Sequence, residues 1–119
     1  MSIRRMADTI VRALEHELAG PAFDVTVAGD EVEHPKPYPD AYLRAAELLG
    51  VRITDCVAIE DSEPGVASAV AAGATTLAVP FHIPLPESPA YTLLDGGLAD
   101  VGLERLVQVH ADRAVKAPR

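Results

Sequence analysis

The sequence predicts an α/β fold with a parallel sheet, and two observations support this prediction. Short apolar or β-branched runs alternate with longer segments whose apolar residues recur every three or four positions. Such alternation is typical of βαβ units, in which helices connect parallel strands and cover the sheet. One apolar run, from Val57 to Ile59, leads directly into two acids, Glu60 and Asp61. Because open α/β sheets bind ligands at the carboxyl ends of their strands, the paired acids mark a candidate site.

Composition places the chain among single-domain globular proteins. Its 119 residues suffice for one domain with a modest core. A formal net charge of −8 argues against nucleic acid or an anionic membrane as the partner. The single cysteine, Cys56, excludes an internal disulfide and fits a reducing compartment. No apolar run approaches the ~20 residues that span a bilayer, and no apolar signal segment follows the first residues. We therefore expect a cytoplasmic protein.

The N-terminal third is predicted to contain a helix, a strand and a stiff loop. Residues 5–19 have apolar side chains at helical spacing, and a Gly-Pro pair ends the run. Residues 23–28 alternate and are β-branched, which predicts a strand. Residues 31–39 include three prolines within five positions, which exclude regular structure. A loop of this kind holds Lys36 in a fixed direction.

The middle of the chain is predicted to form a helix followed by a βαβ unit. Residues 40–49 form the helix, with a glycine at its C-terminal cap. The wholly apolar run 56–59 predicts a strand that is covered on both faces. Ser62 is placed to cap the next helix, which has a proline in its first turn and ends at Gly73. Residues 75–80 predict the following strand.

The C-terminal part is predicted to be less regular. Residues 81–90 are rich in proline and form a surface loop, 91–94 form a short edge strand, and 99–109 form an amphipathic helix. No linker divides the chain, so residues 1–110 are expected to form one domain. Residues 111–119 are expected to be a frayed tail.

Four residues carry the chemistry that this arrangement predicts. Lys36 follows the first strand, and Glu60 and Asp61 end the second, so a parallel sheet brings all three to one edge. A hard cation such as Mg²⁺ takes one or two carboxylates together with phosphate oxygens. The cation and a fixed ammonium group together neutralise the charge that develops on a phosphate in the transition state. Ser62 would orient a carboxylate or a metal-bound water.

Simpler interpretations exist for each of these residues. Glu60 and Asp61 could stabilise the start of a helix through its dipole. Lys36 could be a solvated loop residue. Cys56 begins a buried strand and is interpreted as a core residue, not a nucleophile.

Two stretches resemble motifs of a known family. Residues 35–43 (PKPYPDAYL) and 59–73 (IEDSEPGVASAVAAG) resemble the third and fourth motifs of the haloacid dehalogenase-like superfamily. The similarity is to the subfamily that contains β-phosphoglucomutase, phosphoglycolate phosphatase and sugar-phosphate phosphatases. Residues 23–31 resemble the strand and loop before the third motif, and the whole resemblance covers roughly residues 5–108.

The resemblance implies a Rossmann-like, three-layer parallel sheet and a specific division of roles. An aspartate nucleophile attacks phosphorus and forms an aspartyl-phosphate, which water then hydrolyses. Lys36 stabilises the charge of the nucleophile and the phosphoryl group, and Glu60 and Asp61 hold Mg²⁺. Ser62 and Gly65 support the phosphate side of the site. The implied substrate is a small phosphorylated metabolite.

The chain departs from the family pattern at the nucleophile. The family carries Asp-x-Asp-x-Thr/Ser on an N-terminal strand, and no aspartate here has another two positions on (8, 24, 30, 40, 55, 61, 95, 100 and 112). The second motif also has no counterpart, since Ser2 is the only nearby hydroxyl and no strand precedes it. The chain thus resembles the C-terminal half of such an enzyme, a partial, truncated core that lacks the nucleophile strand and the substrate-selecting cap.

Two functional hypotheses follow. The first is a Mg²⁺-dependent phosphatase or phosphoglucomutase-type enzyme whose 119-residue chain is inactive alone because its nucleophile is absent. The second is a non-catalytic remnant or interaction module that forms a homodimer or complements a separate N-terminal half. Without the two strands that the family places between 23–28 and 56–60, the sheet should have unpaired edges and exposed apolar faces.

Overall fold

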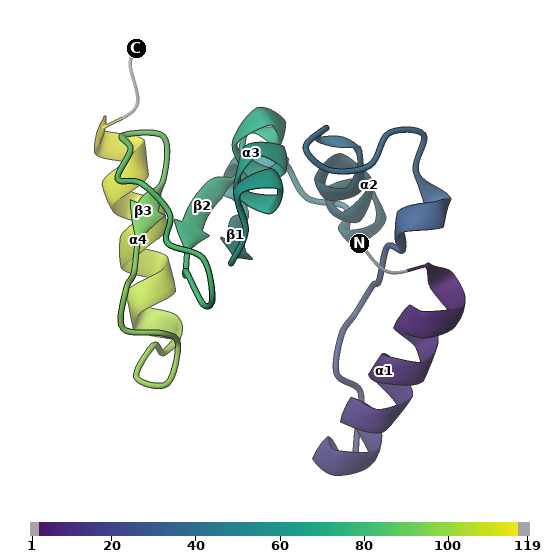
Figure 1. Ribbon diagram of the computed structural model, residues 1–119. Helices are drawn as coiled ribbons and strands as arrows, with labels where there is room; N and C mark the ends of the chain where they lie inside the picture. The colour runs from purple at the N-terminus through teal and green to yellow at the C-terminus, as the bar shows by residue number, and fades with distance from the viewer. Residues whose placement is uncertain (1–2, 117–119) are drawn as a thin grey trace.

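The protein forms an α/β structure in which a small parallel sheet is flanked by helices (Figure 1). The structure is a computed structural model and describes residues 3–116. The helices and strands in chain order are α1 (Arg4–Leu18), α2 (Asp40–Leu49), β1 (Val57–Glu60), α3 (Glu63–Ala72), β2 (Thr75–Ala78), β3 (Thr92–Leu93) and α4 (Leu103–Lys116). Two single 3₁₀ turns, Gly29–Glu31 and Ile53–Asp55, lie in the connections. Within the described range, no helix is long and apolar enough to cross a membrane.

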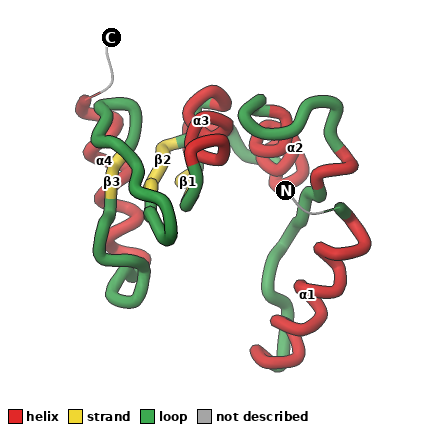
Figure 2. Tube along the Cα trace, in the orientation of Figure 1, coloured by secondary structure: helices red, strands yellow, loops and turns green. Residues whose placement is uncertain are grey.

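The sheet has three parallel strands in the order β1-β2-β3, drawn in yellow in Figure 2. Val57 lies opposite Thr75 and Glu60 opposite Ala78, so β1 and β2 end at the same edge. Leu77 lies opposite Thr92, which places β3 further along the sheet. The predicted α/β class with a parallel sheet is confirmed for this part of the fold.

The core lies around β2. All four of its residues are buried, and both α3 and α4 contact it. Leu77 is fully buried, and Val109 of α4 is almost so. The small residues of α3 let this helix lie close to the sheet, with Ala69 packed against Ala58 and Ala74. A central strand that is covered by helices on both sides is the expected environment for a parallel sheet.

The edge strand β1 is covered on one face only, which corrects the prediction for residues 56–59. Ala58 and Glu60 are buried, whereas Ile59, on the opposite face, is 41% exposed. Among the described residues, β2 is the only strand that pairs with β1. The apolar run therefore predicted the strand correctly, but the prediction that both of its faces are buried was wrong. Whether a strand face is buried depends on which other elements pack against it. The unpaired edge and the exposed apolar face agree with the expectation of an incomplete sheet.

Residues 23–28 do not form a strand, so this second prediction was wrong. The segment is extended, but it runs beside α1 instead of joining the sheet (Figure 1). Arg4 holds it there, since its Nη1 donates to Thr26 Oγ1 at 2.7 Å and its Nη2 donates to the Thr26 carbonyl at 2.9 Å. A β-branched sequence becomes a strand only when another strand is available for backbone pairing. We call residues 3–28 the arm, and residues 29–116, from the Gly29–Glu31 turn to the end of α4, the body.

The remaining boundaries agree with the sequence patterns, with one exception. Helices α2 and α3 end at Gly50 and Gly73, which have positive φ angles of 70° and 97° and cap the helices as expected. The proline-rich segment 81–90 is irregular, and the edge strand after it has two residues. The last helix begins later than predicted and continues to Lys116, although the tail from residue 111 was expected to be frayed. Residues 117–119 lie outside the described range.

Candidate functional site

The carboxyl end of β1 is held in place by the start of α3. Ser62 is the N-cap of this helix, and its hydroxyl accepts a hydrogen bond of 3.3 Å from the backbone N–H of Gly65. Pro64, in the first turn, has no N–H to leave unpaired at a helix start. The backbone carbonyl of Glu60 accepts a 2.7 Å hydrogen bond from Val79 N–H, which ties the strand end to β2. The backbone that carries Glu60 and Asp61 is therefore fixed by both α3 and β2.

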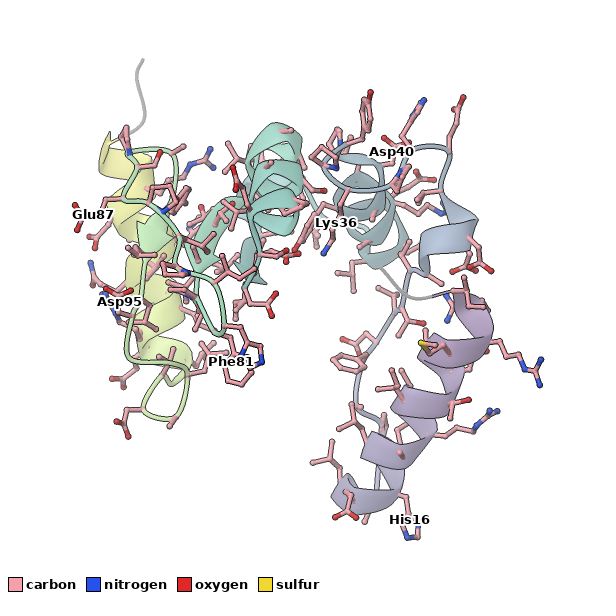
Figure 3. The ribbon with its side chains drawn as sticks, in the orientation of Figure 1. His16, Lys36, Asp40, Phe81, Glu87 and Asp95 are labelled. Atoms are coloured by element: carbon pink, nitrogen blue, oxygen red, sulfur yellow. The ribbon has the colours of Figure 1, made fainter. Side chains whose placement is uncertain are left out.

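The loop that carries Lys36 is attached to α2 and α3. The hydroxyl of Ser68, on α3, donates to the Tyr38 carbonyl at 2.6 Å. Asp40 begins α2, and its Oδ2 accepts from His34 N–H at 3.1 Å. The Lys36–Pro37 peptide bond is cis. These contacts turn Lys36 toward the region between α2 and the end of β1 (Figure 3).

Lys36 and Glu60 form an ion pair, although Lys36 does not follow a strand of the sheet as predicted. The Lys36 ammonium lies 2.6 Å from Glu60 Oε1, and the Tyr42 hydroxyl donates to the same oxygen. Lys36 Nζ is 5.8 Å from the centre of the Tyr42 ring. Only 8% of the Glu60 side chain is exposed, so its charge needs these partners. A buried carboxylate with two donors is stable, whereas an unpaired one would be prohibitive.

Tyr42 is the functional residue that the sequence analysis missed. It was part of the quoted motif, but its phenol received no role. Burial raises the pKa of Tyr42 well above that of an ordinary tyrosine, and the hydrogen bond and negative charge of Glu60 raise it further. The phenol is therefore neutral and able to donate at any ordinary pH. The sequence did offer a signal for this role. Tyr42 lies six residues after Lys36, in the first turn of the predicted helix 40–49.

Gly65 lies against the carboxylate of Glu60, which gives it a packing role that the sequence analysis did not predict. A Cβ at position 65 would lie 1.9 Å from Glu60 Oε2 and 2.4 Å from its Cδ. No side chain fits there unless Glu60 moves. The observed role of Gly65 is thus to leave room for Glu60, and its predicted place on the phosphate side remains a prediction. Ser62 is exposed and caps α3, and its predicted orienting role is likewise untested.

Asp61 and Glu60 supply part of a site for a hard cation. Asp61 is exposed at the strand end, and no salt bridge joins it to another residue in the described range. Both side chains offer the carboxylate oxygens that Mg²⁺ prefers, so the donor chemistry fits. Between residues 3 and 116, however, no three or more metal-binding side chains gather at one place. Two carboxylates leave most of an octahedral shell to water and phosphate oxygens.

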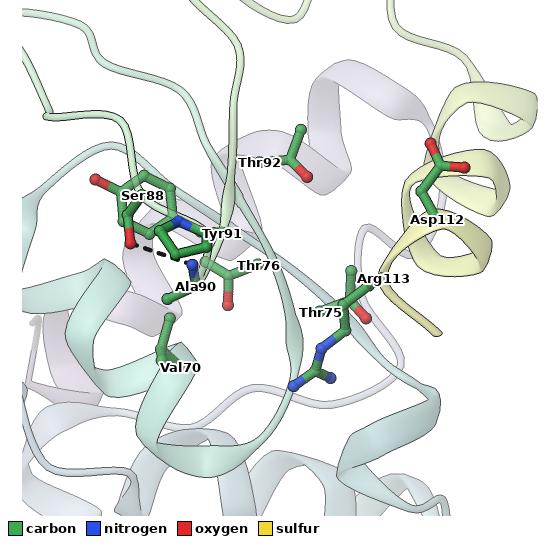
Figure 4. A pocket seen from close by; sticks show the side chains of 10 residues that line it. Val70, Thr75, Thr76, Ser88, Ala90, Tyr91, Thr92, Asp112 and Arg113 are labelled. Atoms are coloured by element: carbon green, nitrogen blue, oxygen red, sulfur yellow. Dashed lines mark hydrogen bonds between the residues drawn. The ribbon is translucent and has the colours of Figure 1, made fainter. Parts of the chain in front are cut away.

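A cavity of about 570 Å³ lies away from these residues (Figure 4). It is lined by residues of β2, the 88–92 segment and α4, among them Thr75, Tyr91 and Arg113. Thr75 begins β2, whereas Glu60 ends β1, so the cavity lies near the amino end of β2 and not at the edge that carries Glu60. Arg113 donates to the Gly73 carbonyl at 2.9 Å and so ties α4 to the end of α3. None of the predicted site residues lines this cavity.

Comparisons with known proteins match this chain to one family. The family described as "haloacid dehalogenase-like hydrolase" matches residues 4–73, which include Lys36, Glu60 and Asp61. Protein CbbY of Rhodobacter capsulatus is 46% identical over 77 residues, which are 65% of this chain and 34% of that protein. Hexitol phosphatase A of Escherichia coli is 46% identical over 70 residues, which are 58% of this chain and 32% of that protein.

A solved structure agrees with the sequence comparisons. The crystal structure of a CbbY mutant from Rhodobacter sphaeroides, in complex with xylulose-(1,5)bisphosphate, has a TM-score of 0.68 and 38% sequence identity. The similarity covers 81% of this chain and 45% of that one. The chain thus spans about a third of the length of these curated relatives and less than half of the solved structure.

Proposed function

This chain belongs to the haloacid dehalogenase-like hydrolase family, and from this we propose that it carries the phosphate-binding and metal-binding side of a phosphohydrolase site. The observation that carries the proposal is the Lys36–Glu60 pair, 2.6 Å long, beside Asp61 at the carboxyl end of β1. Two relatives support a small phosphorylated sugar or polyol as the substrate, since one is named hexitol phosphatase A and another was crystallised with xylulose-(1,5)bisphosphate. We propose the same substrate class here.

Lys36 is the residue that would bind the phosphoryl group. Its side chain is partly exposed, so the ammonium can contact Glu60 and a phosphate oxygen at the same time. Because Glu60 and the 31–39 loop hold the ammonium in place, little reorganisation is needed when charge develops on the phosphate. Tyr42 keeps Glu60 oriented through its neutral phenol, and Gly65 leaves room for the carboxylate.

Glu60 and Asp61 are the residues that would hold Mg²⁺. When bound, this cation would supply Lewis-acid neutralisation of phosphate charge. Asp61 is the more available ligand, because it is exposed and Glu60 already accepts two hydrogen bonds on Oε1. The 119-residue chain contains no Asp-x-Asp pair, so we also propose that it does not hydrolyse phosphate esters by itself.

The proposal is tested by two measurements on the same protein. In the first, the backbone amides of residues 60–62 are followed by NMR as Mg²⁺ is added. We expect weak binding that shifts these amides and is lost in Asp61→Asn, whereas Asp95→Asn, a matched change in an exposed turn, leaves it intact. Shifts that persist in Asp61→Asn would contradict the assignment of the metal side.

The second measurement is the Mg²⁺-dependent hydrolysis of an aryl phosphate. We expect no turnover above that of the Asp61→Asn variant. Turnover that disappears in this variant would mean that the chain has a complete site with a nucleophile outside the Asp-x-Asp pattern, and the proposed inactivity would be wrong.

A second candidate function is a non-catalytic interaction module. The observation that favours it is the open side of β1, where Ile59 is exposed and no described strand pairs with the outer edge. An unpaired strand edge can accept a strand of another chain. Metal binding at residues 60–62 distinguishes the candidates, because an interaction module does not require it.

A further inference from the structure

The cavity between β2, the 88–92 segment and α4 has a buried hydroxyl group in its wall (Figure 4). This hydroxyl belongs to Thr75, which lines the cavity at the start of β2 and is 2% exposed. Within residues 3–116, Thr75 Oγ1 makes no hydrogen bond. Buried polar groups are almost always paired, because leaving one unpaired is unfavourable. We therefore expect a partner for Thr75 that comes from outside the chain.

Arg113, near the end of α4, brings a positive charge to the same part of the cavity. Its Nη1 donates to the carbonyl of Gly73 at 2.9 Å, and Gly73 lies two residues before Thr75. Among the side chains that the structure describes, no carboxylate forms a salt bridge with Arg113. A guanidinium group has several N–H donors, so one hydrogen bond leaves most of them available for an anion.

Another part of the cavity wall is apolar and is held in place by the core. Val70 of α3 and Tyr91 pack against one buried apolar cluster. The Tyr91 hydroxyl donates to the Pro86 carbonyl, which fixes the ring. Ser88 Oγ accepts a 3.1 Å hydrogen bond from Ala90 N–H, drawn as a dashed line in Figure 4. The wall is thus already formed, with an apolar side and a polar end.

The charges around the cavity favour a ligand with a single negative charge. Arg113 is the only cation among the described residues that line it, and the exposed Asp112 adds a negative charge. A phosphate dianion would therefore be poorly compensated, in a protein whose net charge is −8. A carboxylate has one charge and matches the planar fork of a guanidinium group. A cavity of about 570 Å³ has the size of a small-molecule site.

We propose that this cavity binds a small monocarboxylate with an apolar body. The carboxylate accepts hydrogen bonds from the Arg113 guanidinium and from the Thr75 hydroxyl. The apolar body lies against Val70 and the Tyr91 ring. This site lies away from the candidate phosphohydrolase site, and the proposal does not depend on the function proposed there.

The first test is a titration of the full chain with sodium benzoate, an aromatic monocarboxylate, at constant ionic strength, followed by amide NMR. We expect saturable shifts at Thr75, Tyr91 and Arg113, and none at residues 60–62. Benzamide, which has almost the same shape without the charge, should bind about tenfold more weakly. Benzoate that causes no saturable shifts, or benzamide that binds equally well, would overturn the proposal. Inorganic phosphate that binds here more tightly than benzoate would also overturn it.

The second test removes the buried hydroxyl. Thr75→Val changes the side-chain volume little, and we expect it to weaken benzoate binding about tenfold. Without benzoate, its melting temperature should equal or exceed that of wild type, because the hydroxyl has no partner among the described residues. A Thr75→Val protein that is less stable without ligand would show that the hydroxyl is bonded within the chain. That result would contradict the proposal, as would unchanged benzoate binding.

The third test removes the cation. Arg113→Met should weaken benzoate binding at least about tenfold. Arg105→Met removes the same charge from an exposed position on the same helix and should bind benzoate as wild type does. Equal weakening in the two variants would show that overall charge, and not Arg113, attracts the anion, and would overturn the proposal. If Arg113→Met does not fold, because it also loses the bond to Gly73, the results for benzamide and Thr75→Val decide.

Discussion

The arm and the body have equally regular sequences, yet only the body has a core. Helix α1 has a clear apolar face, and residues 23–28 are as β-branched as β2. The arm nevertheless buries little more than Ala28, whereas Leu77, Ala69 and Val109 are almost completely buried in the body. The difference shows that patterning predicts an element, while burial and strand pairing depend on which neighbours are present.

The comparison would fail if apolar residues of the two regions contributed equally to stability. Leu77→Ala removes a fully buried side chain from the central strand, so we expect it to lower the free energy of unfolding by about 3 kcal/mol. Leu14→Ala is the same change on the exposed face of α1 and should cost less than about 0.5 kcal/mol. Both values come from urea denaturation of the monomer. Equal losses would show that α1 packs on the body in solution.

The same contrast applies to glycines. Gly65→Ala places a Cβ 1.9 Å from Glu60 Oε2, so Glu60 must move and we expect a loss of about 2 kcal/mol in unfolding free energy. At Gly20, in the arm, nothing lies within 4 Å of the added Cβ. Gly20→Ala should therefore change stability by less than about 0.5 kcal/mol. Thermal unfolding measures both, and a Gly65→Ala variant as stable as wild type would contradict the described position of Glu60.

A smaller effect is expected from Tyr42 at high pH. Because its pKa is raised in the folded protein, ionisation of this phenol favours the unfolded state. The contribution of Tyr42 is fully present below the ordinary tyrosine pKa of about 10 and is lost as the pH rises above it. Wild type should lose stability more steeply above pH 10 than Tyr42→Phe, which has no group to ionise. Identical slopes in the two proteins would show that Tyr42 is not buried against Glu60.

The elements of the body could be predicted from the sequence, because local signals determine them. Ser62, Gly50 and Gly73 cap their helices as expected, and Lys36 lies beside Glu60 at the carboxyl end of β1. The reason differs from the predicted one, because residues 23–28 form no strand of the sheet and Lys36 is instead positioned by the 31–39 loop against α2 and α3. The close approach of Gly65 to Glu60 and the donor role of Tyr42 could not be predicted, because they depend on the distances between packed elements.

The errors concern elements whose state depends on neighbours outside the local sequence. Residues 23–28 have strand propensity, but no strand among those described is beside them, so they remain extended along α1. Ile59 belongs to an apolar run, but no element covers its face. The apolar and β-branched patterns of a segment do not show whether another strand or helix is present to pair with it or cover it. The structural lesson is that propensity indicates what a segment can form, and pairing decides what it does form.

Amide hydrogen exchange of the full chain, at a concentration where it is monomeric, tests the central claim most directly. The claim is that the body alone forms the cooperative unit that carries the site, and that the arm opens independently of it. We predict that the amides of β2 and of Val79, which bonds to the Glu60 carbonyl, exchange most slowly and with one common free energy. The amides of α1 should exchange much faster, through local opening. If α1 and β2 were protected equally, the arm would be part of the same cooperative unit, and the division of the molecule into arm and body would be wrong.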